Sequence, residues 1–291
     1  MDTRQVLSSN IFIHFLSGCN AACEINLFIS AMEIRTNTFV DFLSVFFHAV
    51  CNSIYKKGGE MKVKVGTQNL RILTAKESIN PFSERFWIKR MKRIAANIKS
   101  VDLDLIAVQE SIGRLQMYVL RYYLGWRKYR FISVRQGFTP SRVGIMYKRK
   151  YKRIEKENFL LSKAESFKKH ERRGVRGKFE VGNRHIDLAS VHLSHYSEES
   201  YNEGLTNLKL MITGTPSVWI AGDFNKENVT FWYYLAHDEA IDKTYISFID
   251  NYKGQKIDYI FTPQWIERTP TKTLGDNLAS DHLLVYSEIM I

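Results

Sequence analysis

The sequence predicts an α+β fold in which two β-sheets pack face to face and helices cover their outer surfaces. From Met61 onward, short strand-like segments alternate with amphipathic helices, and no flexible linker, internal repeat or low-complexity stretch separates them. Apolar residues make up 45% of the 291 residues and aromatic residues 13%, with only 5 prolines, a composition that supports a core and excludes disorder as the dominant state. Many strands with few helices are typical of layered sheets.

The first elements follow from apolar spacing. Residues 62–67 alternate between apolar and polar, which predicts a half-buried strand. Residues 83–98 have helical spacing, and a second helix begins near residue 115. Between them, residues 103–109 form a nearly continuous apolar run, as expected for a strand covered on both faces. The apolar stripe of the first helix consists of Trp87, Met91, Ile94 and Ile98, and the second helix is predicted to run through Leu115, Val119 and Tyr122.

The rest of the chain continues the pattern with strands on both sides of one more helix. That helix is predicted over residues 197–212, with the polar run at 197–200 as its start. The predicted strands are residues 129–134, 142–148, 152–161, 174–181, 185–192, 217–221, 256–261 and 283–289.

Residues 1–60 differ from residues 61–291 in charge and in cysteine content. The first segment carries four basic and five acidic side chains and all three cysteines, which we interpret as free thiols, whereas the second has a net charge of +13 and no cysteine. The segment Lys57–Glu60 can be encoded as a bacterial ribosome-binding site directly before Met61. One hypothesis is therefore that Met61 is the natural start and that the first 60 residues are translated upstream sequence. The alternative is an apolar appendage that docks on the domain or on a membrane.

Neither apolar run in residues 1–60 reaches the roughly 18 uninterrupted residues of a membrane span, and no secretory signal pattern is present. We therefore expect a cytoplasmic location, with membrane contact by residues 1–60 as the less favoured alternative. We further expect a monomer without an obligate protein partner.

The net charge of +12 and the isoelectric point near 9.5 favour polyanionic partners, namely nucleic acid, phosphorylated small molecules or an acidic membrane face. Basic clusters lie at residues 89–93, 148–153 and 168–173. Together with nearby aromatic residues they predict a groove for a nucleic-acid backbone and bases, and the alternative is a set of solvated helix and turn faces. The aromatic residues of this predicted groove are Tyr122, Tyr123, Trp126 and Tyr129.

Polar residues that could take part in catalysis or metal binding lie where the apolar strands begin or end. Strand ends deliver side chains from a rigid scaffold to a shared rim, so we expect these residues to meet. Turn chemistry explains any one of them equally well, but not the whole series. The series consists of Asn69, Glu110, His192, Asp223, Asn225, Asp258, Asp281 and His282.

The residue types in this series suit metal-assisted hydrolysis by water. Carboxylates and an amide oxygen are hard ligands for Mg²⁺ or Mn²⁺. Two histidines with further carboxylates can supply a general base, a general acid and phosphate contacts. The sequence contains no glycine-rich phosphate loop and no motif for a serine or cysteine nucleophile.

An ordered set of six motifs resembles the endonuclease/exonuclease/phosphatase superfamily over residues 62–291. The motifs are Gln68-Asn69, Gln109-Glu110-Ser111, His192-Leu193-Ser194-His195, Gly222-Asp223-Phe224-Asn225, Lys256-Ile257-Asp258-Tyr259 and Ser280-Asp281-His282. The resemblance implies a four-layer αββα sandwich of two mainly antiparallel sheets flanked by helices, with the site at one edge of the paired sheets. It also implies a divalent-metal-dependent phosphoesterase that uses Mg²⁺ or Mn²⁺.

The resemblance assigns a role to each position. Glu110 would bind the metal with Asn69 beside it, and Asp281 would complete the metal region. Asp223 would orient or deprotonate the attacking water, and Asn225 would hold that water or a phosphate oxygen.

The same resemblance gives the histidines their roles. His282 would contact the scissile phosphate, with Asp258 fixing its tautomer and favouring its charged form. His192 would donate to a phosphoryl oxygen or protonate the leaving group. Many relatives carry an acidic residue where this chain has Ser141-Arg142, which offers Arg142 as a phosphate contact instead.

These roles leave the substrate open. The basic charge favours nucleic acid cleaved by an endo- or exonuclease. The alternative is a phosphatase or phosphodiesterase for inositol phosphates, sugar phosphates or phospholipid headgroups. A basic nucleic-acid-binding module without turnover is a third hypothesis, disfavoured because Glu110, Asp223 and His282 are all present.

Overall fold

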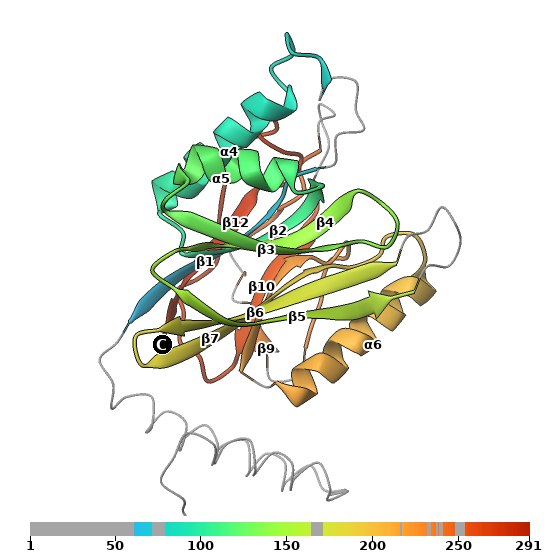
Figure 1. Cartoon of the computed structure of the whole chain (residues 1–291). Helices are drawn as coiled ribbons and strands as arrows, with labels where there is room; N and C mark the ends of the chain where they lie inside the picture. The colour runs from blue at the N-terminus through green and yellow to red at the C-terminus, as the bar shows by residue number, and fades with distance from the viewer. Residues whose placement is uncertain are drawn as a thin grey trace, which may run out of the picture. The chain divides into compact units, whose positions relative to one another are not determined.

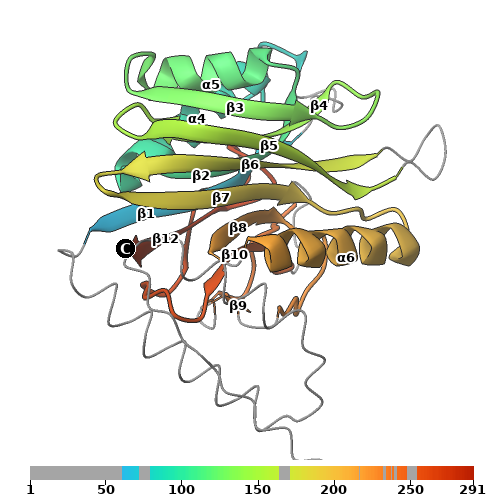
Figure 2. The ribbon, with the colours of Figure 1, turned by 60° about the horizontal axis from the view of Figure 1, so that its bottom comes forward.

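A computed structural model describes residues 61–71, 79–163, 171–215, 217–231, 234–236, 238, 241–247 and 254–291 of the chain. The hypotheses on residues 1–60 therefore lie outside the described residues. In the described part, two six-stranded sheets stack face to face, with helices on their outer faces (Figures 1 and 2). No helix among the described residues is both long and apolar enough to cross a membrane.

The first sheet has the strand order β11-β12-β1-β2-β4-β3. All neighbours pair antiparallel except β1 and β2, which are parallel and are joined through helix α4. The bounds are β1 Lys62–Asn69, α4 Trp87–Val101, β2 Leu105–Ile112, α5 Leu115–Gly125, β3 Tyr129–Arg135, β4 Ser141–Lys148, β11 Lys272–Leu274 and β12 Leu284–Met290.

The second sheet has the order β5-β6-β7-β8-β10-β9. It too contains one parallel pair, β7 and β8, joined through helix α6, while its other neighbours are antiparallel. The bounds are β5 Lys152–Ser162, β6 Arg172–Val181, β7 Arg184–His192, α6 Glu198–Gly214, β8 Val218–Asp223, β9 Tyr234–Leu235 and β10 Asp258–Pro263.

Three apolar clusters hold the four layers together. One lies between the sheets, where alternate residues of both, such as Val65, Ile145 and Leu188, face each other. The second packs α4 and α5 on the first sheet, and the third packs α6 on the second sheet. The predicted αββα sandwich is therefore confirmed.

The predicted order of helices and strands agrees with the structure, with two exceptions of detail. The short strands β9 and β11 were not predicted. The second predicted helix is present as α5, but two of the residues that predicted it, Leu115 and Tyr122, are exposed, and the buried face is formed by other side chains. The buried residues of α5 are Gln116, Met117, Leu120 and Leu124.

The two parallel pairs explain how the fold builds a site. Parallel strands end at the same edge, so β1 and β2 deliver Asn69 and Glu110 together, and β7 and β8 deliver His192 and Asp223 together. Because the sheets pack face to face, the two pairs of strand ends meet at one edge of the sandwich.

Candidate functional site

Close approach of β7 and β8 fixes the position of Asp223. His192 pairs in register with Asp223, and one residue earlier Val191 pairs with Gly222. A β-carbon at Gly222 would lie 2.1 Å from the carbonyl oxygen of Val191, so only glycine fits there.

Asp223 is the centre of the cluster. Its side chain is 2% exposed, and its Oδ2 accepts a hydrogen bond of 3.0 Å from Nδ2 of Asn69. The Nε2 atoms of His192 and His282 lie 3.5 and 3.8 Å from the same oxygen. Asp223 Oδ1 accepts the backbone N–H of Asn225 at 2.8 Å. Residues from both sheets therefore converge on one buried carboxylate.

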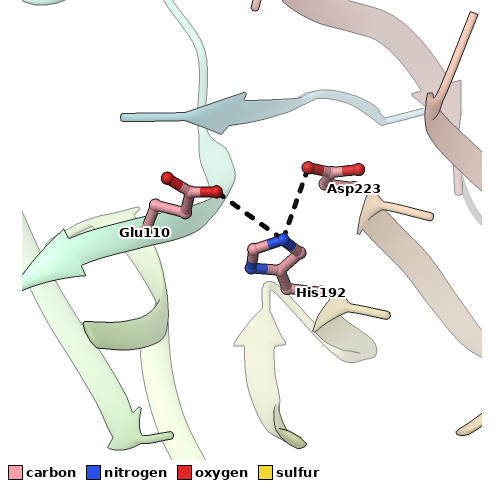
Figure 3. Close-up of side chains that lie close together, drawn as sticks. All are labelled: Glu110, His192 and Asp223. Carbon is pink, nitrogen blue, oxygen red and sulfur yellow. Dashed lines mark ion pairs between the residues drawn. The ribbon is translucent and has the colours of Figure 1, made fainter. Parts of the chain in front are cut away.

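Glu110 approaches the cluster from the first sheet through an irregular backbone. Its φ of 55° lies in the left-handed region, and the register of β2 against β4 shifts at this point. Its Oε1 lies 3.7 Å from Nε2 of His192, so this ring nitrogen faces both Glu110 and Asp223 (Figure 3). Irregular backbone in a functional strand end is a common way of re-aiming a side chain.

His192 is held in a neutral form by its burial and by a neighbouring arginine. Its Nδ1 lies 3.2 Å from a guanidinium nitrogen of Arg172. An arginine can only donate, so Nδ1 is the acceptor and the ring proton is on Nε2, which faces Glu110 and Asp223. Burial first, and then the charge of Arg172, holds the pKa of His192 well below its usual value. The ring is thus a neutral N–H donor at physiological pH.

His282 is in the opposite state. Its Nδ1 lies 2.8 Å from Oδ2 of Asp258, and its Nε2 faces Asp223. Burial alone lowers the pKa of His282, but the charges of Asp258 and Asp223 outweigh it and raise the pKa to about 10. Asp258 is itself positioned by Thr244, whose hydroxyl accepts the backbone N–H of Asp258 at 2.9 Å. The site therefore holds one charged and one neutral histidine.

The electrostatics of Asp223 suit a base. Burial first, then the neighbouring carboxylates of Asp258 and Glu110, raise its pKa to about 7, while His282 and the backbone N–H of Asn225 oppose the rise. A carboxylate with a raised pKa is a stronger base than an exposed one.

The remaining site residues from the sequence lie around this centre. Asn225 has a φ of 52° and donates from Nδ2 to the carbonyl of Leu193, which fixes its amide. Asp281 is mostly buried and lies 3.3 Å from a guanidinium nitrogen of Arg71. The side chains of eight of the nine predicted site residues thus lie at or next to one edge, and the side chain of the ninth, Arg142, is held on β3.

Arg142 pairs with Ser111, next to Glu110, but its side chain is held on β3. Its guanidinium donates to the hydroxyl of Ser133 on β3, and its near charged neighbours are Arg114 and Arg135. The arginine beside His192 is Arg172, which sequence reasoning placed only in a basic cluster. The sequence signal that could have identified Arg172 is its position as the first residue of β6, the strand that pairs with β7.

The predicted nucleic-acid groove needs correction. Tyr129 is fully buried and donates its hydroxyl to the carbonyl of Leu103, so its ring cannot stack on a base. Residues 148–153 lie at the far end of the strands from the site, because Tyr147 pairs with Leu105 at the start of β2 and Glu110 lies near its end. Residues 168–170 lie outside the described residues.

Two sets of side chains could hold a metal ion. In each, the possible ligand atoms lie within 4.8 Å of one another: Glu110, His192 and Asp223 in one, and Asp223, Asp258 and His282 in the other. Since Nε2 of His192 carries a proton and His282 is charged, the oxygen donors are the ligands these sets offer. A small number of carboxylate ligands is typical of Mg²⁺ and Mn²⁺ sites, because these ions keep several bound waters.

Comparisons with known proteins bear on the fold. No family model and no curated protein matches the sequence. Solved structures do match: an endonuclease/exonuclease/phosphatase from Bacteroides vulgatus has a TM-score of 0.68 at 19% identity, over 79% of this chain and 98% of that one. A mannosyl-6-phosphatase from Bacteroides thetaiotaomicron gives 0.65 at 19% identity, over 79% and 100%. D. rerio TDP2 complexed with single strand DNA product gives 0.62 at 15% identity, over 78% and 98%. The chain therefore has the DNase I-like sandwich fold of the endonuclease/exonuclease/phosphatase proteins.

Proposed function

We propose that the chain hydrolyses phosphoester bonds with the help of a divalent metal ion and an attacking water. The observation that carries the proposal is the pairing, at one strand edge, of a buried basic carboxylate, Asp223, with a charged His282 and a neutral His192. Hydrolysis of a phosphoester needs a base for the water and positive charge for the phosphoryl oxygens, and these groups supply both.

Glu110 would hold the metal ion, with Asn69 and Asp281 nearest in support. Both flanking groups are fixed: Asn69 Oδ1 accepts the backbone N–H of Arg71 at 2.8 Å, and Asp281 pairs with the Arg71 side chain. A bound Mg²⁺ or Mn²⁺ supplies Lewis-acid polarisation of a phosphoryl oxygen.

Asp223 would orient and deprotonate the water. Its Oδ1 is held by the backbone N–H of Asn225 and its Oδ2 by Asn69, so the carboxylate cannot rotate away. Asn225 sits two residues on and would bind the water or a phosphoryl oxygen. The raised pKa of Asp223 makes proton transfer from water easier than it is to an exposed aspartate.

The two histidines would contact the phosphoryl group in different ways. His282, kept charged by Asp258, would stabilise negative charge as it develops on the phosphoryl oxygens. His192 would donate its Nε2 proton in a hydrogen bond, with Arg172 holding the tautomer from behind. A neutral ring with a depressed pKa is a hydrogen-bond donor and not a source of acid, so we assign His192 to a hydrogen bond that strengthens as negative charge develops on the phosphoryl oxygen, and not to protonation of the leaving group.

For the substrate we propose a phosphodiester in nucleic acid. Support comes from the net charge of +12 and from the likeness in fold to TDP2 with its single strand DNA product. The second candidate is a small phosphomonoester. It is favoured by the position of residues 148–153, which removes one basic cluster from the neighbourhood of the site, and by the likeness in fold to a mannosyl-6-phosphatase.

A panel of substrates with Mg²⁺, with Mn²⁺ and with EDTA tests both the metal-dependent phosphoesterase activity and the choice of substrate. The panel holds single-stranded and plasmid DNA, abasic duplex, RNA, sphingomyelin, inositol phosphates, mannose 6-phosphate and two nitrophenyl esters. We expect metal-dependent cleavage, with DNA or RNA turned over faster than the small esters, and its loss in Asp223→Asn by about two orders of magnitude. Turnover that survives EDTA would overturn the metal requirement, and turnover that survives Asp223→Asn would overturn the role of Asp223. Absence of turnover of every substrate would overturn the phosphoesterase assignment. Turnover confined to sugar or inositol phosphates would replace nucleic acid with the second candidate.

A further inference from the structure

A charged cavity lies between α5, β3 and β5, and none of the residues around Asp223 lines it. It has a volume of about 410 Å³, which is within the range of small-molecule sites. Helix α5 lies over β3 there, and β5 of the other sheet runs alongside (Figures 1 and 2). Lys156 on β5 donates to the backbone carbonyl of Ser133 on β3 at 3.2 Å, so the two sheets meet at this wall.

The charged lining of this cavity is entirely basic. Arg114 precedes α5, Arg121 lies on it, Arg130 comes from β3, and Arg153 and Lys156 come from β5. No carboxylate lines the cavity, and none of the five cations forms a salt bridge with a carboxylate of the described part of the chain. The cavity is therefore a concentration of positive charge that no ion pair within the described residues neutralises.

The acidic residues of β5 do not reach this lining. Glu155 and Glu157 flank Lys156 in the sequence, and successive side chains of a strand point to opposite faces. Glu157 pairs with Arg176 on β6 at 3.0 Å, which places its charge on the other side of the strand.

Mutual repulsion is visible in the electrostatics. Burial first, and then the charges of Arg142, Arg153 and Arg114, lower the pKa of Lys156. Arg121 shows the same pattern, with burial first and then Arg149 and Arg130. An anion bound among these groups would relieve this repulsion, and none of the cations would have to break an ion pair to bind it.

An aromatic group forms one side of the cavity. Tyr118 lines it and is 40% exposed, and its ring packs edge-on against Phe131 at 5.0 Å and stacks on Trp126 at 5.8 Å. The guanidinium of Arg121 lies 4.0 Å above Trp126 and donates to two backbone carbonyls, which fixes its position. The wall is thus preorganised, and Tyr118 offers a ring face or edge at the rim.

We propose that this cavity binds a compact polyphosphate anion, meaning a chain of two or more adjacent phosphate groups with or without a nucleoside attached. Five cations exceed what a single phosphate neutralises, which points to several phosphates. They surround one cavity from α5, β3 and β5 and do not form a line, which points to a compact ligand and not to an extended strand. The proposal concerns a site separate from Glu110 and His192 and does not depend on the hydrolytic function.

Calorimetric titration of the full chain in EDTA tests the proposal, because EDTA removes any phosphate binding through a metal at the Glu110 site. The probes are tripolyphosphate, ATP and an eight-nucleotide single strand. The test variant is Arg153→Gln/Lys156→Gln, whose side chains are exposed, and the matched control is Lys92→Gln/Lys209→Gln, which removes the same charge from exposed positions on α4 and α6. Thermal unfolding of each variant checks that the fold is kept.

We expect one tripolyphosphate per chain, with binding about 10- to 100-fold weaker in the test variant and unchanged in the control. ATP binding more tightly than tripolyphosphate would identify a nucleotide, with Tyr118 contacting the base, and equal binding would identify the phosphate chain alone. Absence of binding, or equal weakening in both variants, would overturn the proposal. The same holds if the oligonucleotide binds more tightly than both small probes and loses affinity in the test variant, since the site would then take a strand.

Discussion

Replacing Arg172 tests whether a buried arginine sets the state of His192. Arg172→Met keeps an unbranched apolar side chain in the buried space but removes the donor to Nδ1 of His192, now at 3.2 Å. Without that donor, either nitrogen of the neutral ring can carry the proton. A proton on Nδ1 leaves Nε2 as an acceptor, so the ring no longer donates a hydrogen bond from the nitrogen that faces Glu110 and Asp223.

The magnitude follows from the hydrogen bond that is lost. A hydrogen bond to a charged group contributes about 1.5–3 kcal/mol, so its loss corresponds to a change of about 10- to 150-fold in the population of the competent tautomer. We expect kcat for a small phosphodiester to fall by about that factor. KM should change little, because Arg172 is behind the ring and His282 still provides a positive charge for binding.

Arg173→Met is the matched control. The neighbouring residue is the same type, but its guanidinium is bound to Glu171 and its side chain is 41% exposed. The assays are steady-state kinetics and the ¹⁵N shifts of the His192 ring in labelled, metal-free protein, with thermal unfolding as a check on the fold. Equal losses in the two variants, or an Arg172→Met enzyme with an unaltered ¹⁵N pattern and full kcat, would refute the reasoning.

Further predictions concern the metal, His282 and the basic cluster at residues 148–153. Glu110→Gln keeps the size of the side chain and removes its charge, so the metal concentration for half-maximal activity should rise and activity should fall about 100-fold; full activity at saturating Mg²⁺ would contradict this role. Asp258→Asn removes the nearest charge that raises the pKa of His282, so that pKa should drop from about 10 and the activity lost at pH 9 should exceed that lost at pH 6, as a pH–rate profile measures. Lys148→Met should lower the free energy of unfolding in urea by about 2–4 kcal/mol, because its side chain is only 8% exposed and pairs with buried Asp104. Lys152→Met should lower it by less than about 0.5 kcal/mol, because that side chain is 77% exposed. Equal losses would show that exposure does not decide what these lysines contribute.

Much of the fold was accessible from the sequence because its strands are short and sharply bounded. Alternating or continuous apolar runs predict where each strand lies, but register and pairing depend on contacts between distant segments. Helix α5 shows the limit: apolar residues lie on most of its faces, so spacing did not distinguish Leu115 and Tyr122, which are exposed, from Met117 and Leu120, which are buried. The strands β9 and β11, of two and three residues, are too short to carry a periodic signal.

The sequence predicted which residues form the site but not their protonation states or tautomers. Strand-end positions identified the residues that meet around Asp223, since parallel strand pairs must end at a common edge. The tautomer of His192 could not be predicted because it depends on Arg172, which belongs to a sequence run of lysines and arginines that reads as a solvated face. Burial of one cation in such a run is decided by strand pairing, here between β6 and β7.

The same distinction changes what the net charge of this protein indicates. Three cations of the basic cluster at residues 148–153 are paired with carboxylates far from the site: Lys148 and Lys150 with Asp104, and Lys152 with Glu180. Arg172 donates to the ring of His192 and orients it. Arg90 is fully buried and donates from its guanidinium to the carbonyl of Ala279. Five cations that have no carboxylate partner in the described part of the chain lie instead between α5, β3 and β5. Excess charge of +12 therefore does not by itself argue for a nucleic-acid groove over the active site, and a steep salt dependence of binding would have to be traced to individual cations before it identified the substrate.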